Sequence, residues 1–581
     1  DLQELRDGIE KRKAAAKTTL NRLLLNQFQI LDIRYEQATW DETKCRQGKP
    51  ERRHLKDADV EVLKPFHWGY EFDQIIRERG GFDAIITNPP WEVFKPNAKE
   101  FFEEYSALVT KKKMSIKDFE REEAKLLKDK DIREAWLEYQ SEYPHVSAFY
   151  RSAPQYKNQI SVVDGKKAGT DINLYKLFVE QCFNLLKQGG YCGIVIPSGI
   201  YTDLGAKQLR ELLFTQSQVT GLFCFENRKG IFEGVHRSDR FLVLTFEKGG
   251  VTGSFPAAFM RLDVGDLERF PQEGAINIAV DLVRRLSPDS LSVLEFKTEA
   301  EVAFAEKIVK HPPLDKIESS FHHVRFEREL DPTAHPGFFR SQPSKNMMPL
   351  LEGRNIHQFT STFSTDYRFW VREKDARELL LGRTEDVGQA LSYQTYRLGF
   401  RKIANKTNER TMISTIIPPR LVSENLQTCS VFREDGIRVV TNADMIVLCA
   451  IFNSIVYDSI IRMKVDANMN FFLVYSTQVP RLTEKDSAYE LILKRAARLI
   501  CTTSEFDDLA KEVGLNGPEE GATNEVERAR LRAELDGLIA HLYGLTEDAF
   551  AYTLTTFPLV ADPVKDAARN AYRDVVRGLI R

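Results

Sequence analysis

The feature that most constrains the fold is an apolar run that stops abruptly at two consecutive prolines. Phe82-Asp83-Ala84-Ile85-Ile86-Thr87 comes after Gly80-Gly81 and is followed at once by Asn88-Pro89-Pro90-Trp91. Because proline has no backbone N–H, it cannot donate to a sheet ladder, and the strand must end at Thr87. A short apolar run bounded by turn residues is typical of a buried strand. The sequence therefore predicts a buried strand that delivers a rigid loop.

Alternating helical and strand-like segments follow this run. Amphipathic helices are expected at 172–187 and near 206–213, and strands at 191–196, 219–225 and 241–246. Gly189-Gly190 is the expected stop of the first helix. Alternation of strands and helices is typical of a doubly wound α/β sheet. We therefore expect the α/β class, with a partial, doubly wound Rossmann-like sheet and helical insertions.

The length of 581 residues exceeds what one hydrophobic core can organise, since cores stop growing at roughly 250 to 300 residues. Changes of pattern divide the chain into five expected regions. They are a helical remainder or insertion at 1–75, an α/β half-domain at 76–250 with a charged helical insertion at about 97–165, a helical connector at 251–313, an aromatic, strand-rich α+β domain at 314–481, and a C-terminal helical region at 482–581.

Composition restricts the partners and the compartment. Lys and Arg number 82 against 85 Asp and Glu, so a nucleic acid would be met by local basic patches and not by a global positive field. The longest apolar stretch, 445–456, is interrupted by Asn453 and is shorter than the ~18 residues of a membrane span. Seven cysteines without Cys-x-x-Cys spacing favour a reducing cytoplasm. His322-His323 has no further ligands at metal-site spacing, so no metal is expected.

The rigid loop after the first strand carries the residues best suited to chemistry. The amide oxygen of Asn88 and the backbone carbonyl of Pro89 can each accept a hydrogen bond from an exocyclic amine, which favours a tetrahedral nitrogen that can attack a methyl group. Trp91 offers a flat surface on which a base flipped out of a duplex can stack. The alternative interpretation is structural: any strand can end at two prolines, and the aromatic side chain then only packs.

Asn88-Pro89-Pro90-Trp91 resembles the fourth motif of the amino-methyltransferases, which reads Asn, Asp or Ser, then Pro-Pro, then Tyr, Phe or Trp. The resemblance is strongest to the type IIG restriction-modification methylases, and it extends from about 65 to 560. The segments that carry it are Phe66-His67-Trp68, 171–178, 190–199, Phe225-Glu226-Asn227-Arg228-Lys229, 351–356 and 468–472. Their order, with the catalytic loop before the recognition segments, is also that of the family.

The resemblance implies a site-specific, adenine-specific DNA methyltransferase of a restriction-modification or phage-defence system, with S-adenosylmethionine as the methyl donor. Asn88 and the Pro89 carbonyl would orient the amine. Pro90 would stiffen the loop, Trp91 would stack on the base, and Phe225, Asn227 and Arg228 would support the flipped nucleotide or its strand. No cysteine follows a proline, so transfer is expected to be direct, without a covalent intermediate.

One departure from the family concerns the cofactor. S-adenosylmethionine is expected at a glycine-rich turn after the first strand, because only glycine lets the backbone approach the methionine closely. The sequence contains no Gly-x-Gly and begins at Asp1 without a Met. We therefore expect the cofactor turn on a missing N-terminal half or on a second subunit, with Asp83 as the one candidate cofactor contact in this chain. A nuclease or a helicase is a candidate further partner.

The region 314–481 is the expected target-recognition domain, and it contains a basic, amide-rich cluster. Arg397, Arg401, Lys402 and Lys406 lie close together in sequence, which suits contacts to DNA phosphates and base edges. A solvated charged face is the alternative. Double-stranded DNA is therefore the expected macromolecular partner, and no membrane is expected.

Two other functions stay open on the sequence. The chain could be a DNA-binding specificity subunit that delegates catalysis to a partner chain, which the absent glycine turn favours and the intact Asn-Pro-Pro-Trp disfavours. It could also methylate a protein glutamine, whose amide nitrogen poses the same lone-pair problem. The large aromatic C-terminal region disfavours that substrate.

Overall fold

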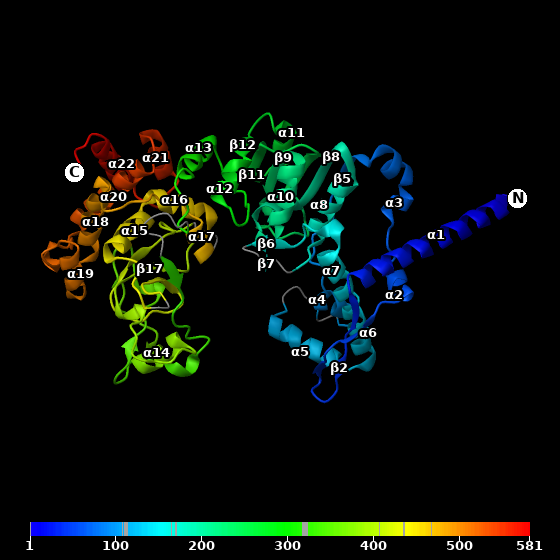
Figure 1. Ribbon diagram of the computed structural model, residues 1–581, viewed down its shortest axis with the longest axis horizontal. Helices are drawn as coiled ribbons and strands as arrows, with labels where there is room; N and C mark the ends of the chain where they lie inside the picture. The colour runs from blue at the N-terminus through cyan, green and yellow to red at the C-terminus, as the bar shows by residue number, and fades with distance from the viewer. Residues whose placement is uncertain are drawn as a thin grey trace. The chain divides into compact units, whose positions relative to one another are not determined.

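The computed structural model describes residues 2–106, 109, 114–163, 166–168, 171–315, 324–405, 407–433, 436–465 and 468–580. The chain forms two compact units, Asp1–Val293 and Leu294–Arg581, and each is described by itself (Figure 1). The boundary falls within 251–313, the segment expected to be a helical connector. That segment is therefore divided between the two units.

The first unit is built on a six-stranded sheet in the order β12-β11-β9-β10-β8-β5. β5 is parallel to β8, and β9 is parallel to β11, whereas β10 is antiparallel to both β8 and β9. The expected α/β class is therefore present, as a mixed sheet. The strands are β5 (Phe82–Thr87), β8 (Leu186–Pro197), β9 (Ser217–Glu226), β10 (Arg240–Lys248), β11 (Ser254–Arg261) and β12 (Ile276–Ala279).

Two details of this sheet correct the sequence prediction. β11 and β12 lie where a helical connector was expected. β11 was not recognised in the sequence because it contains Pro256, and proline is rare inside sheets. α8 (Leu174–Leu185) ends before Gly189, and Gly189-Gly190 lies inside β8, where the register with β5 shifts. A Cβ on Gly190 would lie 2.8 Å from the Phe82 carbonyl oxygen. Gly190 therefore permits a close approach of β5 and does not stop a helix.

Helices cover one face of the sheet. α8 and α10 (Lys207–Gln216) pack against β8 and β9, and Cys192, Ile194 and Ile196 of β8 are buried. On β9, Phe223 contacts Phe270 with ring centroids 5.1 Å apart. Helices α8 and α10 therefore form a layer against the sheet, and aromatic side chains pack together at β9.

The rest of the first unit is largely helical and has small cores of its own. α1 (Leu2–Ile30), α2 (Asp57–Val62) and α7 (Tyr143–Ser152) share a core with the antiparallel pair β1 (Arg34–Gln37) and β4 (Glu51–His54). α4 (Ala98–Glu103), α5 (Ile116–Leu126) and α6 (Lys130–Ser141) occupy the segment expected as a helical insertion, around Phe102 and Trp136.

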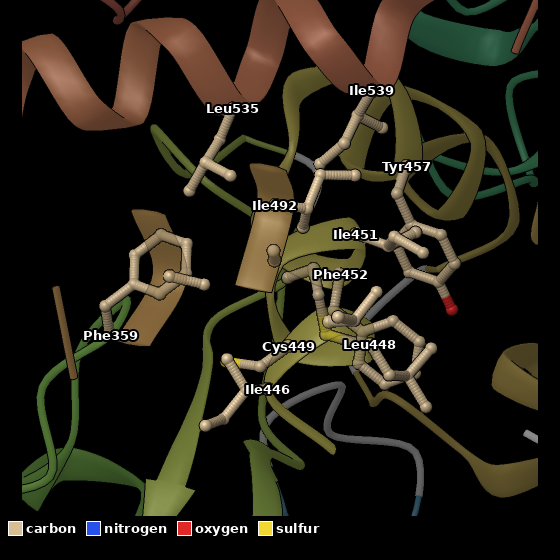
Figure 2. Close-up of a cluster of buried hydrophobic side chains, with 14 of the residues drawn as sticks. Phe359, Ile446, Leu448, Cys449, Ile451, Phe452, Tyr457, Ile492, Leu535 and Ile539 are labelled. Carbon is tan, nitrogen blue, oxygen red and sulfur yellow. The ribbon is translucent and has the colours of Figure 1, made fainter. Parts of the chain in front are cut away.

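The second unit combines a sheet in the order β13-β19-β17-β18 with a group of helices. Its strands are β13 (Arg325–Glu327), β17 (Arg397–Arg401), β18 (Ser414–Ile417) and β19 (Leu426–Ser430), and its main helices are α15 (Asn442–Asn453), α16 (Ile455–Lys464), α18 (Ser487–Ile500), α20 (Glu525–Leu542) and α22 (Asp562–Val576). α15 packs against β17 and β18. Figure 2 shows Phe452, Tyr457, Ile492 and Ile539 in this core.

No single helix among the described residues is long and apolar enough to cross a membrane. α15 and α16 reach that length and composition only as a pair bent by 68°. Nearly all of their side chains are buried in the core of the second unit.

Asp536 of α20 gives the second unit a pH-dependent stability. Its buried carboxylate accepts a hydrogen bond from the Ile455 N–H at the start of α16 (2.7 Å). Burial raises the pKa of Asp536 to about 6. Because the folded pKa lies above the unfolded value, the stabilisation is present below pH ~4 and lost as the pH rises through about 6.

We expect this group to lower the free energy of unfolding by about 3 kcal/mol between pH ~4 and pH ~7. Urea unfolding across that range checks the prediction. Asp536→Asn should remove most of the fall, and a variant that keeps the whole pH dependence would assign it to other groups.

Candidate active site

Three loops lie at the end of the sheet where β5, β8 and β9 finish. The first begins at Asn88, the second at Ser198, and the third spans 227–239 between β9 and β10. The Ser198 N–H donates to the carbonyl of Arg240 (3.1 Å), which ties the second loop to the start of β10. Ligands of open α/β sheets bind at the carboxyl ends of the strands. The loop from Asn88 is therefore at the end of the sheet where a site is expected.

Asn88 leads the first loop with its side chain in solvent. Asn88 is exposed, whereas Pro89 directly after it is buried. Among the described residues no hydrogen bond occupies the Asn88 amide, so its oxygen is available to accept one. Two consecutive prolines restrict φ to about −65° and stiffen the backbone. The loop therefore presents an unoccupied amide on a rigid support.

Trp91 is held against the sheet by its ring and its N–H. The indole Nε1–H donates to the Val195 carbonyl of β8 (3.3 Å). The ring meets Phe232 edge to face at 5.5 Å and is nearly parallel to Phe241, with centroids 6.0 Å apart. Trp91 is only partly buried. It is therefore fixed in an aromatic cluster while part of its surface stays accessible.

The residues after Trp91 pair with the start of α8. The Leu174 N–H donates to the Glu92 carbonyl (3.0 Å), and the Phe94 N–H donates to the Ile172 carbonyl (2.7 Å). Two segments about 80 residues apart, 88–94 and 171–178, are thus joined by backbone hydrogen bonds. Both were singled out in the sequence, and the structure brings them together.

Asn227 and Phe225 hold the third loop from inside. Asn227 is fully buried, and its Nδ2 donates to the carbonyls of Phe232 and Val235 at 2.9 Å each. Its Oδ1 accepts from the Phe232 N–H (2.9 Å). Phe225 is also buried and stacks on Phe241 at 5.2 Å. In this conformation neither side chain can contact a nucleotide, because both are buried. Instead, both side chains stabilise the conformation of the loop.

Arg228 is the one predicted residue of this loop that reaches solvent. Its side chain is 68% exposed and pairs with Glu226 at 2.9 Å. The Glu226 carboxylate is only 11% exposed, so the guanidinium projects into solvent from a largely buried partner. Arg228 therefore remains available to an anionic ligand.

Residues that were not among the expected site residues shape the same end of the sheet. Phe232 and Phe241 form the aromatic wall beside Trp91. Arg210 is buried in α10 and donates to the carbonyls of Ile200 and Asp203 at 2.6 Å each, which pins the second loop. Its helical spacing from Ala206 and Leu213 places it on the buried face, a signal that could have identified it.

Asp83 lies near the opposite end of β5 from Asn88. Its carboxylate pairs with Lys187 (2.5 Å) and with Arg79. The hydrogen bond from Lys187 and the nearby positive charges hold its pKa below the usual range. Asp83 therefore forms ion pairs with two basic residues of this chain, and these ion pairs account for the position of its carboxylate.

The residues of the basic cluster expected in 314–481 differ in how deeply they are buried. Arg397 is completely buried in an ion pair with Glu329, and burial lowers its pKa to about 10. Arg401 is partly buried and donates to the Ile356 carbonyl, while Lys402 pairs with Glu424. Lys406 lies outside the described residues. Both faces of β17 are covered at Arg397, so this residue does not offer its side chain to DNA.

Within the described residues, no group of three or more His, Cys, Asp and Glu side chains could hold a metal ion. His322 and His323 lie outside that part of the chain.

Comparison with known families identifies a restriction-modification methylase family. The model of the Eco57I restriction-modification methylase family matches residues 7–133 and 139–232. These ranges include β5, the Asn88 loop, α8, β8, β9 and the start of the third loop. The resemblance to restriction-modification methylases is therefore confirmed for the part of the chain that carries the candidate site.

Three known proteins with limited similarity to this chain differ in the extent of the match. A protein of Methanocaldococcus jannaschii named as a type II restriction enzyme and methyltransferase is 23% identical over 347 residues, which cover 56% of this chain and 23% of that protein. The type IIL restriction-modification enzyme MmeI, solved with DNA, has a TM-score of 0.37 at 11% identity, covering 87% of this chain and 60% of its own. The type IIG restriction endonuclease BpuSI has a TM-score of 0.26 at 13% identity, covering 66% and 51%. The chain thus spans about a quarter of its curated relative.

Proposed function

Because the segments around Asn88 match the Eco57I restriction-modification methylases, we propose that this protein methylates the exocyclic amino group of adenine in duplex DNA, as part of a restriction-modification or phage-defence system in the cytoplasm. The observation that carries the proposal is the exposed, unoccupied amide of Asn88 on a proline-stiffened loop at the carboxyl end of β5. Transfer of a labelled methyl group to duplex DNA is the direct test.

The loop would act on the nucleophile. An exocyclic amine is a poor nucleophile because its lone pair is delocalised into the ring. The Asn88 oxygen and the Pro89 carbonyl would accept its two N–H groups and favour the tetrahedral nitrogen of the transition state. Since the prolines hold the backbone in place before substrate arrives, little reorganisation accompanies the reaction.

The methyl donor of the proposed reaction is S-adenosylmethionine. The residues of this chain do not fit that cofactor well: no Gly-x-Gly occurs in the sequence, and Asp83 already pairs with Lys187 and Arg79. We therefore expect the 581-residue chain to bind the cofactor weakly or not at all.

Trp91 would form the wall against which the flipped base stacks. A stacked base gains about 1 to 3 kcal/mol, so Trp91→Ala should lower the flipped population by roughly 5- to 100-fold. Trp91→Phe keeps an aromatic surface and should recover part of this loss. A fluorescent purine at the target position, which brightens when it leaves the duplex stack but is quenched against an aromatic side chain, provides the measurement: Trp91→Ala should flip the base less or leave it brighter than in the wild type. Equal fluorescence in the wild type and Trp91→Ala would show that the indole only anchors the loop.

Arg228 would contact a DNA phosphate beside the flipped base. Arg228→Ala should weaken DNA binding and lower the slope of log affinity against log salt by about one. Arg52→Ala is a matched control, because Arg52 is also 68% exposed and pairs with Glu36 at 2.8 Å. A salt slope that changes equally in both variants, or in neither, would exclude a specific phosphate contact at Arg228.

Sequence recognition would lie in the second unit. Arg401, Lys402 and Lys406 remain the proposed DNA contacts there, whereas Arg397 is excluded by its burial. Cleavage or translocation of DNA would require a nuclease or helicase partner.

A further inference from the structure

Two guanidinium groups of the second unit are held against one tight turn, the His357 turn (356–360). Backbone hydrogen bonds of 2.9 and 3.0 Å join His357 to Thr360 and close the turn. Arg401 of β17 donates to the first carbonyl of the turn, and Arg528 of α20 donates to the Thr360 hydroxyl (3.1 Å). Arginine side chains from a strand and from a helix therefore reach both ends of the turn.

The His357 turn is anchored in the core and leaves its imidazole partly accessible. Phe359 is buried in the core of the unit (Figure 2), and its φ of 57° lies in the left-handed region that residues other than glycine rarely adopt. The Gln358 amide donates to the Asn453 carbonyl of α15 (3.1 Å). His357 is half-buried, and among the described residues its ring nitrogens have no hydrogen-bond partner. The imidazole is therefore fixed in place and open to a ligand.

The surroundings of His357 are strongly positive. Burial lowers the pKa of His357 to about 4, together with the charges of four arginines. In order of effect these are Arg401, Arg532, Arg410 and Arg528. Arg532 lies on α20, one turn after Arg528. A neutral imidazole among four guanidinium groups indicates a point of positive potential, which attracts an anion.

Carboxylates balance these arginines incompletely. The nearby acids include Asp458, Asp536 and Glu525. Asp458 is completely buried and pairs with Arg410 at 2.6 Å, whereas Glu525 is 82% exposed and lies 3.3 Å from Arg532. In the part of the chain that the structure describes, Arg401 forms no ion pair, and its Nε is buried without a hydrogen-bond partner. Arg401 therefore carries a positive charge that no described carboxylate neutralises.

A single phosphate would supply this missing counter-ion. Its oxygens can accept hydrogen bonds from an imidazole N–H and from guanidinium groups, and arginine binds phosphate well because its donors form a planar fork. The Arg532 side chain is 34% exposed. Phe363, whose ring centroid lies 4.9 Å from that of His357, is 60% exposed. The site is therefore open to a ligand from solvent.

We propose that His357, Arg401 and Arg532 together bind one backbone phosphate of DNA. That the phosphate belongs to DNA rests on the proposed function, whereas the anion site follows from the charges around His357. The three side chains come from a turn, from β17 and from α20, which are far apart in sequence. A phosphate held by all three would fix how the second unit lies on the duplex, without a preference for sequence.

Arg532→Ala should weaken binding of the chain to duplex DNA roughly tenfold at ~0.1 M salt and lower the slope of log affinity against log salt by about one. Fluorescence anisotropy of a labelled duplex, measured at several salt concentrations without a methyl donor, gives both values. Arg530→Ala is the matched control and should change neither, because Arg530 lies on the same helix, is 57% exposed and pairs with Glu534 at 2.6 Å. His357→Ala is a second variant in case the first misfolds, and should weaken binding about threefold to tenfold.

Inorganic phosphate separates the two sources from which such an anion could come. Equilibrium dialysis with radiolabelled phosphate should show that duplex DNA displaces it from the wild type. Phosphate that stays bound in excess DNA would assign the site to a free phosphate compound and overturn the proposal. Unchanged affinity and salt slope in Arg532→Ala and His357→Ala, or equal losses in Arg530→Ala, would also overturn it. DNA binding without methyl transfer counts against the proposed reaction alone, whereas methyl transfer with normal DNA binding by these variants counts against the site alone.

Discussion

Asn88→Ala is expected to slow methyl transfer by about 100- to 1,000-fold while DNA affinity stays close to that of the wild type. The amide oxygen contributes most when the amine nitrogen becomes tetrahedral, so its loss raises the barrier more than it weakens binding. Single-turnover transfer and equilibrium DNA binding separate the two effects in the intact protein.

Asn184→Ala serves as the control for this prediction. Asn184 is an exposed asparagine of α8 in the same unit, and its amide donates to the Gln155 carbonyl (3.1 Å). It should transfer methyl groups at the wild-type rate. Normal transfer by Asn88→Ala would remove the assignment of the loop and favour a DNA-binding subunit without catalysis.

Asp458→Ala should lower the free energy of unfolding of the second unit by about 3 to 5 kcal/mol. Asp458 is completely buried and pairs with Arg410 at 2.6 Å. It also accepts the backbone N–H groups of Thr411 and Met412 at 3.1 and 3.2 Å. Its removal leaves a largely buried guanidinium and two buried N–H groups without a partner. Chemical denaturation monitored in the second unit gives the change.

Asp366→Ala is the matched comparison for the buried pair. Asp366 pairs with Arg354 at the surface, where the two side chains are 78% and 43% exposed. Water screens such a pair, so its loss should cost less than about 1 kcal/mol. Comparable losses in the two variants would contradict the burial of Asp458.

The candidate site could be predicted from the sequence because two consecutive prolines strongly determine the local backbone conformation. Two prolines end a strand whatever surrounds it, and the expected strand ends at Thr87 as predicted, but the expectation that it is buried was wrong, since none of its residues is buried. Periodicity also located α8 and α10 to within a few residues. β11 was missed because Pro256 disfavours a strand, and only the neighbouring strands reveal the pairing.

The roles of individual polar residues were harder to predict than the loop that carries them. Arg397 and Asn227 have the residue types of DNA contacts, yet both are fully buried, Arg397 in an ion pair with Glu329 and Asn227 in hydrogen bonds to its own loop. A residue type suggests what a side chain can bind, but tertiary packing decides whether it reaches solvent. Trp91 illustrates this point: its residue type suggests stacking on a base, but its orientation is set by contacts with Phe232 and Phe241, in a segment about 140 residues away.

Identification of the methylated product is the decisive measurement of the proposed activity. The intact protein is incubated with duplex DNA and S-adenosylmethionine that carries a labelled methyl group, and the digested DNA is resolved into nucleosides by mass spectrometry. We expect labelled N6-methyladenine, and we expect it to be lost in Asn88→Ala. Label on cytosine or on a protein glutamine, or DNA binding without any transfer, would contradict it.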